Sequence, residues 1–197
     1  MLRARAEKLL TWAGDKNPGP WTAHSERAAD AAFKIARECG LDAERAYVSG
    51  LLHDVGRYEG ATDLRHIYTG YELLVKEGFG EIAQIALTHS FPFKDIGAYS
   101  GKNDCSPEET AFIIKYLSET EFGDYDALIQ LCDALASPEG VNVIEVRLTD
   151  VATRHGFNEF TIKKWDATLT IKKYFDWLCG KNIYSLFRAE MERSLFE

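Results

Sequence analysis

Apolar residues recur along the chain at intervals of three and four, the spacing that places side chains on one face of a helix. From Thr22 to Cys39 one such face carries His24, Ala28, Ala31, Ala32 and Ile35. Gly40 follows directly and predicts the end of this helix. Similar patterns predict helices at about 2–13, 42–56, 62–78, 81–89, 107–118 and from 124 to just before Pro138.

The C-terminal part of the chain also has a helical pattern. Two or three further helices are expected between residues 142 and 195, divided at Gly156 and Gly180. The β-branched run 141–146 is compatible with a strand, but its period is nearer that of a helix, across Val143, Ile144, Arg147, Leu148 and Val151. The pattern therefore predicts an all-α fold.

Composition and charge narrow the function classes. The chain has 197 residues, 46% of them hydrophobic, which suits one domain with a sizeable core. Its formal net charge of −8 argues against a nucleic-acid surface, which needs clustered Lys and Arg. An acidic protein can still bind an anionic small molecule where metal ions and a few cations supply local positive potential. The composition is equally compatible with a monomer and with a homo-oligomer.

The cysteines and the apolar segments bear on location. Cys39, Cys105, Cys132 and Cys179 are widely spaced and form no CxxC pair, and Cys39 and Cys132 lie in helical apolar patterns as core residues. We therefore expect neither a zinc finger nor a disulfide framework, which suits a reducing compartment. The N-terminus lacks a long apolar segment, and no stretch approaches the roughly 20 apolar residues that span a bilayer. These features predict a soluble cytoplasmic protein with no membrane partner.

Four residues do not fit a purely structural interpretation. The doublet His53-Asp54 closes a helix of small and apolar residues, His24 lies on an apolar helix face, and Asp133 is flanked by Leu131, Cys132, Ala134 and Leu135. A buried carboxylate costs several kcal/mol unless it is paired, hydrogen-bonded or bound to a cation. His53 and Asp54 alone are equally compatible with a solvated helix end, and His24 alone with a core histidine. The four together favour a metal site.

These residues, in this order, resemble the H…HD…D signature of the HD superfamily of metal-dependent phosphohydrolases. The matching segments are His24-Ser-Glu-Arg-Ala-Ala, Leu51-Leu52-His53-Asp54-Val55-Gly56-Arg57 and Leu131-Cys132-Asp133-Ala134-Leu135. The resemblance covers about residues 20–140. It implies one HD-type helical bundle, followed by a C-terminal helical extension at about 141–197, and it implies that His24, His53, Asp54 and Asp133 hold a metal ion.

Two further histidines extend the resemblance. His66 and His89 lie where several HD branches complete a second metal site that shares the doublet aspartate, and the pattern around them is closest to the symmetrical diadenosine tetraphosphate hydrolases. The cyclic-dinucleotide branch is disfavoured, since Ser90 stands where it has a further histidine and its GYP signature is absent. The alternative is one first-turn histidine in water and one at a helix C-terminus, facing the dipole.

The resemblance also implies roles. Asp54 and Arg57 are the expected catalytic residues, and Arg57, Arg65 and Lys94 the expected substrate-binding ones. Each of these cations has a solvated alternative. The metal would be one or two divalent ions, Fe, Mn, Zn, Co or Ni, because imidazole and carboxylate ligands alone cannot choose among them.

The expected function is hydrolysis of a small phosphorylated molecule, with a nucleotide favoured, through a metal-activated water. A mixed-valent di-iron oxygenase of the HD type and a non-catalytic ligand-binding sensor remain alternatives. Aromatic residues near the predicted ligands, which either wall a pocket or pack a loop, are Trp21, Phe91, Phe93 and Tyr99.

Overall fold

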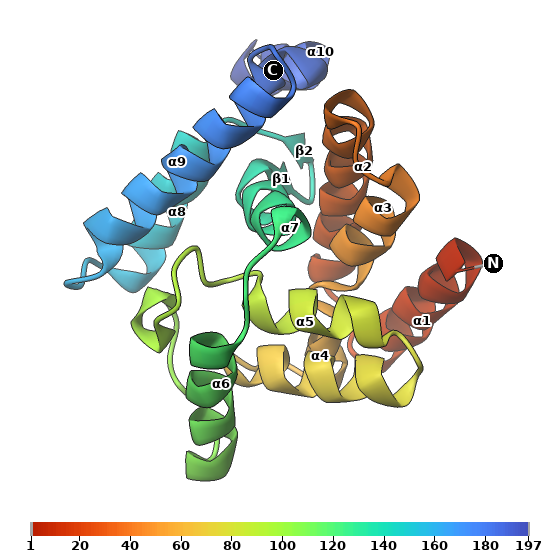
Figure 1. Ribbon diagram of the computed structural model, residues 1–197, viewed down its shortest axis with the longest axis vertical. Coiled ribbons are helices and arrows are strands. Elements are labelled where there is room, and N and C mark those ends of the chain that lie inside the picture. The colour runs from red at the N-terminus through yellow and green to blue at the C-terminus, as the bar shows by residue number, and fades with distance from the viewer. Residues whose placement is uncertain (1, 197) are drawn as a thin grey trace.

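The computed structural model describes residues 2–196 and confirms the all-α fold (Figure 1). Within this range the α-helices are α1 (Leu2–Lys16), α2 (Trp21–Cys39), α3 (Ala43–Leu52), α4 (Arg65–Lys76), α5 (Gly80–Thr88), α6 (Pro107–Glu119), α7 (Asp124–Leu135), α8 (Ile144–His155), α9 (Thr161–Leu178) and α10 (Arg188–Phe196). Short 3₁₀ helices occur at Val55–Glu59, Ile96–Ala98 and Ile183–Phe187. None of the helices in the described range combines the length and apolar character that a bilayer crossing requires.

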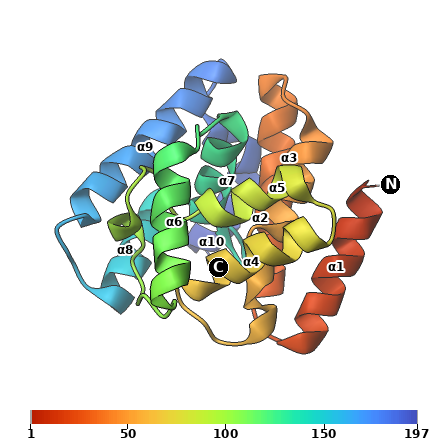
Figure 2. The same ribbon diagram turned by 60° about the horizontal axis from the view of Figure 1, so that its bottom comes forward.

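Helix α7 occupies the middle of the molecule. Helices α2 and α3 pack on one side of it and α8 and α9 on the other, while α4, α5 and α6 lie across one end (Figures 1 and 2). The apolar face of α7 packs with α2, α8 and α9 in a core that includes Leu128, Leu131 and Cys132, all fully buried, while α4 and α6 contribute to separate clusters. A polar side chain on the last turn of α7 therefore lies among several helices at once.

The close packing of α2 against α3 depends on small residues. A Cβ atom at Gly50 would lie 2.8 Å from the backbone nitrogen and Cα of Ala29, closer than real contacts allow. Ala28, Ala29 and Ala32 are fully buried on the facing helix. This approach holds the end of α3, and with it the His53-Asp54 doublet, against the start of α2.

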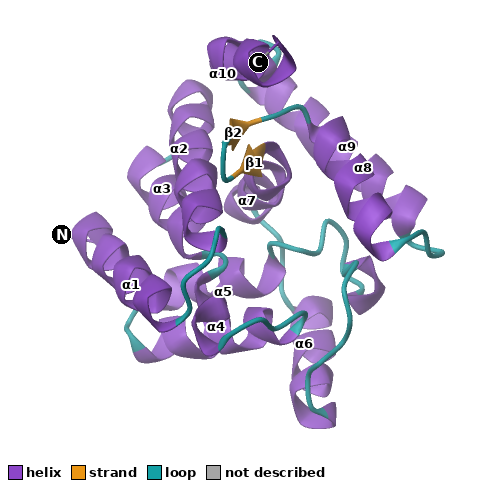
Figure 3. Cartoon of the chain, turned by 180° about the vertical axis from the view of Figure 1, so that it is seen from behind, coloured by secondary structure: helices purple, strands orange, loops and turns teal. Residues whose placement is uncertain are grey.

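Several predicted elements differ in their bounds: the helix expected at 2–13 continues to Lys16, and the one expected at 62–78 covers Arg65–Lys76. The helix expected at 42–56 ends at Leu52, and a 3₁₀ helix continues from Val55. The run 141–146 is divided: Gly140–Val141 (β2) pairs antiparallel with Ala136–Ser137 (β1), and α8 begins at Ile144 (Figure 3). The hairpin reverses the chain after α7, so that α8 returns past the end of α7.

The interpretation of the cysteines is wrong in part. Cys39 and Cys179 form a disulfide between the C-terminal ends of α2 and α9, so that Cys39 is not an unpaired core residue. The two residues are 140 positions apart, and only the tertiary packing of the C-terminal helices brings them together. Cys132 is buried and unpaired, as expected, and Cys105 is also free. Cysteine usage therefore does not favour a reducing compartment.

Candidate metal centre

The His53-Asp54 doublet lies where the chain leaves α3. His53 keeps helical dihedral angles, whereas Asp54, with φ of −101° and ψ of 10°, has left the helix. This change allows two adjacent side chains to converge, although neighbours within a helix point about 100° apart. His53 is 0% exposed and Asp54 is 5% exposed. The doublet thus places a carboxylate in the interior beside an imidazole.

Three histidines are oriented in the same way. Nδ1 of His53 pairs with the carbonyl oxygen of Gly50 at 2.6 Å, Nδ1 of His89 with that of Ala86 at 2.9 Å, and Nδ1 of His66 with that of Asp63. Each ring donates its Nδ1–H to a carbonyl three residues earlier, so that Nε2 carries the lone pair; that of His66 also has a long contact of 3.4 Å with Nη2 of Arg57. Such second-sphere bonds set the tautomer and ring direction of metal-binding histidines.

These lone pairs point at Asp54. Nε2 of His66 lies 3.1 Å and Nε2 of His89 3.5 Å from Oδ1 of Asp54, and Nε2 of His53 lies 3.9 Å from Oδ2. A deprotonated Nε2 cannot donate to a carboxylate, and Oδ1 of Asp54 has no hydrogen-bond partner, nor has Nε2 of His53, although both atoms are buried. Lone pairs therefore face one another across a gap that a cation would fill.

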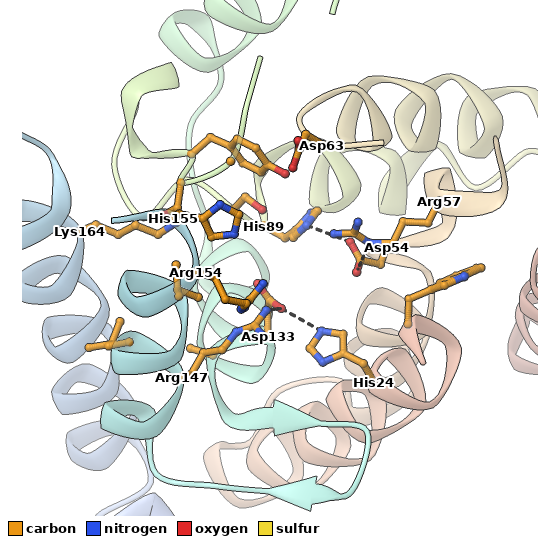
Figure 4. A pocket seen from close by; sticks show the side chains of 18 of the residues that line it. His24, Asp54, Arg57, Asp63, His89, Asp133, Arg147, Arg154, His155 and Lys164 are labelled. Atoms are coloured by element: carbon orange, nitrogen blue, oxygen red, sulfur yellow. Dashed lines mark hydrogen bonds and ion pairs between the residues drawn. The ribbon is translucent and has the colours of Figure 1, made fainter. Parts of the chain in front are cut away.

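The ligand atoms form two groups that share Asp54. Those of His24, His53 and Asp54 lie within 4.8 Å of one another, as do those of Asp54, His66 and His89. Asp133, from the last turn of α7, adds a second carboxylate. Its Oδ1 lies 2.9 Å from Nε2 of His24 and 3.8 Å from Nε2 of His53 (Figure 4). All six residues predicted as metal ligands are thus brought together from five segments of the chain.

Burial and neighbouring charges keep His53, His66 and the two aspartates in their metal-binding protonation states. Burial lowers the pKa of His53 to about 4 and also lowers that of His66, which Arg57 lowers further. Burial would raise the pKa of Asp54, but the Arg57 guanidinium, whose Nε donates to Oδ2 at 2.7 Å, together with His53 and His66 holds the pKa well below its usual range. Neutral imidazoles and ionised carboxylates fit a divalent ion.

The centre opens into a cavity of about 590 Å³, within the range of small-molecule sites. Asp54, His24, His89 and Asp133 lie on its wall together with cationic side chains from three segments, Arg57, Arg147, Arg154 and Lys164 (Figure 4). Trp21, Tyr99 and Trp165 line it as well. Burial raises the pKa of Tyr99, so its hydroxyl is protonated at neutral pH.

Two predicted substrate-binding residues are not brought to this cavity. Arg65 bonds to Glu109 at 3.2 Å and to Glu59 at 3.0 Å, because its helix begins on the far side of the 3₁₀ turn. Lys94 lies 3.5 Å from a carboxylate oxygen of Glu121. Neither lines the cavity, and both cations already have carboxylate partners.

The aromatic residues divide in the same way. Trp21 and Tyr99 line the cavity. Phe91 is fully buried in a core beneath α4 and α6, and Phe93 stacks against Phe160 at 6.3 Å between ring centroids.

Sequence reasoning missed the cations that α8 and α9 supply. Arg147 stands among Val143, Ile144, Leu148 and Val151 on an otherwise apolar helix face, and a charge at an inward position was the available signal. Lys164 had no comparable signal. His155, to which no chemistry was assigned, also lines the cavity.

Fold and centre together define an all-helical protein with a buried cluster of histidines and aspartates at a small-molecule cavity. A family model described as HD domain matches residues 21–137, and the chain belongs to this family. The match includes all six clustered residues and ends before α8. Neither the search of curated proteins nor the search of solved structures found a match.

Proposed function

We propose that this protein is a metal-dependent phosphohydrolase that cleaves a phosphate ester or anhydride in a small molecule. HD domain proteins are generally metal-dependent hydrolases. The observation that carries the proposal is the buried Oδ1 of Asp54, which has no hydrogen bond and faces Nε2 of His66 and His89. In this proposal His24, His53, Asp54 and Asp133 hold one ion, and Asp54, His66 and His89 hold a second.

The bound ions would supply Lewis acidity and a water molecule of lowered pKa. The chain supplies the rest. Arg57 is held by its Nε bond to Asp54, and its Nη1 and Nη2 make long contacts of 3.4 Å with the carbonyl oxygen of Thr62 and Nε2 of His66, which a phosphoryl oxygen could replace. The protonated Tyr99 hydroxyl can donate to a phosphoryl or leaving-group oxygen. Trp21 and Trp165 offer ring faces for the organic part of a substrate.

The size of the cavity supports a small substrate. A volume of about 590 Å³ accommodates a nucleotide or a sugar phosphate. We keep a nucleotide as the favoured substrate because three aromatic rings line the cavity. The diadenosine tetraphosphate branch has no support from the comparisons, so a dinucleotide is one member of the substrate panel and is given no priority.

The test combines metal analysis with turnover. Purified protein should contain one or two divalent transition-metal ions per chain, and should release phosphate or a nucleotide from at least one member of a panel of phosphomonoesters, phosphodiesters and anhydrides. Asp54→Asn, which conserves side-chain volume, should lower metal content and reduce kcat/KM at least about 100-fold. Asp30→Asn is the matched control, since Asp30 is an exposed aspartate of α2.

The alternatives give different results in the same experiment. A di-iron protein that consumes oxygen with an organic substrate would indicate an oxygenase. Full metal loading without turnover on any phosphate compound would indicate a ligand-binding sensor. Unchanged activity in Asp54→Asn would refute the proposed role of the centre.

A further inference from the structure

Three cations line the cavity from outside the segment that the family model matches, and one of them, Arg154, is bonded to the carboxylate of Asp150, which leaves Arg147 and Lys164. Arg147 lies on α8 and Lys164 on α9, both beyond residue 137, where the match ends. Both line the same cavity as Asp54 and Asp133, and Figure 4 shows them on the side away from Arg57. The C-terminal helices therefore contribute positive charge to a site whose ligands come from the HD domain.

The guanidinium of Arg147 has no hydrogen bond within the described part of the chain. Its nearest carboxylate oxygens are Oδ1 of Asp133 at 3.7 Å and Oδ2 of Asp150 at 3.8 Å, both beyond hydrogen-bond distance. Its side chain is 36% exposed, and that surface opens on the cavity. Arginine offers five N–H donors in a planar array that matches phosphate oxygens. Arg147 lines the cavity, and its two ion pairs with the protein are too long to be hydrogen bonds.

Lys164 has no direct ion pair among the described residues, although the charge of Asp133 acts on it from a longer distance. Its Nζ bonds to Oγ of Ser100 at 3.2 Å, and no carboxylate within residues 2–196 lies within ion-pair distance. Burial lowers its pKa to about 8; the charge of Asp133 opposes this shift, and repulsion from Arg147 adds to it. Lys172, two turns later on α9, shows the usual solution for a buried lysine, because its Nζ contacts Oδ2 of Asp176 at 2.6 Å.

Arg147 and Lys164 are like charges that face one cavity, and Asp133, which acts on both, has its Oδ1 2.9 Å from Nε2 of His24 in the metal centre, so a further anion at the two cations would be favourable. We propose that Arg147 and Lys164 form an oxyanion-binding subsite, with which the C-terminal helices hold a phosphoryl group of the substrate. The identity of the anion rests on the proposed function. The Ser100 hydroxyl, already bonded to Lys164, is a further donor at this place.

The experiment measures binding of inorganic phosphate by isothermal titration calorimetry, using the full chain at matched metal content in each sample. Lys164→Met and Arg147→Met should each raise the dissociation constant for phosphate about tenfold or more, which is the usual effect of losing a charge-assisted hydrogen bond. Lys164→Arg should retain most of the affinity. Lys163→Met is the matched control, since Lys163 is exposed on the same helix, with Nζ 4.1 Å from the ring centre of Phe93. The phosphate affinity of this variant should stay within twofold of that of the unmutated chain.

Several outcomes overturn the proposal. Equal phosphate affinity in Lys164→Met, Arg147→Met and Lys163→Met would show that the two cations do not bind the anion, as would an unmutated chain that binds no phosphate. Thermal unfolding of each variant verifies that a loss of binding is not a loss of fold.

Failure of the proposed function gives a different pattern. Phosphate binding that depends on Lys164, with no turnover of any phosphate compound, supports the subsite and refutes the hydrolase. Turnover whose KM is the same in Lys164→Met and the unmutated chain, together with unchanged phosphate binding, refutes the subsite and leaves the hydrolase in place.

Discussion

Gly56, two residues after the doublet, is the position where a single methyl group should disturb the centre most. A Cβ atom there would lie 1.9 Å from the carbonyl oxygen of His66, 2.5 Å from the amide nitrogen of Gly70 and 2.8 Å from Oγ1 of Thr69. The two closest atoms belong to the backbone of α4 and cannot rotate away. Gly56→Ala therefore requires α4 to move relative to the 3₁₀ turn.

The required movement can be estimated from these distances. Real Cβ contacts are essentially never under 3.0 Å, so the carbonyl of His66 must retreat by about 1.1 Å. Overpacking of this kind costs about 1–3 kcal/mol, and in a chain of this size lowers Tm by roughly 2–12 °C. The same shift separates Nε2 of His66 from Oδ1 of Asp54, now 3.1 Å apart, and should weaken metal binding.

The assay pairs thermal unfolding with metal titration, and Gly80→Ala is the control. Gly80 is the first residue of α5, and a Cβ atom there would meet nothing within 4 Å. This variant should keep the Tm and metal affinity of the unmutated chain. A Gly56→Ala protein with unchanged Tm and unchanged metal affinity would refute the close contact between the turn and α4. If Gly80→Ala lowers Tm and metal affinity by the same amounts, the effect comes from replacing any glycine and not from the contact at Gly56.

Two further predictions concern stability. Cys179→Ser removes a crosslink to Cys39 across 140 residues and should lower the free energy of unfolding by about 2–5 kcal/mol in urea titrations. Cys105→Ser, at a free cysteine, is the control and should change this free energy little. If a reductant does not change the stability of the unmutated chain, the prediction is refuted. Between pH 6.5 and about 4, His53 of the metal-free protein is neutral in the folded state and protonated in the unfolded state. The free energy of unfolding should therefore fall by about 3 kcal/mol as the pH drops through this interval. His53→Gln should flatten that slope, and an unchanged slope would assign it to other groups.

Local periodicity accounts for what the sequence predicts well. The apolar face of α2 places His24 beside Ala28 and Ile35 because all three obey one helical period, and the structure buries them together. The carboxylate of Asp133 could be recognised in the same way, since it interrupts an apolar run. Such anomalies can be detected one helix at a time, so the ligands could be predicted without knowing how the helices pack.

Residues whose role depends on packing alone could not be assigned in this way. Lys94 is close in sequence to His89, yet a turn carries it toward Glu121, while Lys164 is distant in sequence and lies in the cavity. The Cys39–Cys179 disulfide has the same origin, since neither cysteine stands out in its own helix. A residue that is close in sequence to a metal ligand need not line the cavity, because the turns between helices redirect the chain.

The division of the site between two parts of the chain explains how an acidic protein can present an anion-binding cavity. The net charge of −8 is spread over the surface, where water screens it, whereas the carboxylates of Asp54 and Asp133 are directed at the metal ligands. Arg57 compensates Asp54 from within the HD domain, and Arg147 faces Asp133 from α8. Once metal ions neutralise Asp54 and Asp133, these carboxylates no longer compete with an external anion for Arg57 and Arg147. Metal binding and oxyanion binding should therefore reinforce each other, since each removes a charge that opposes the other.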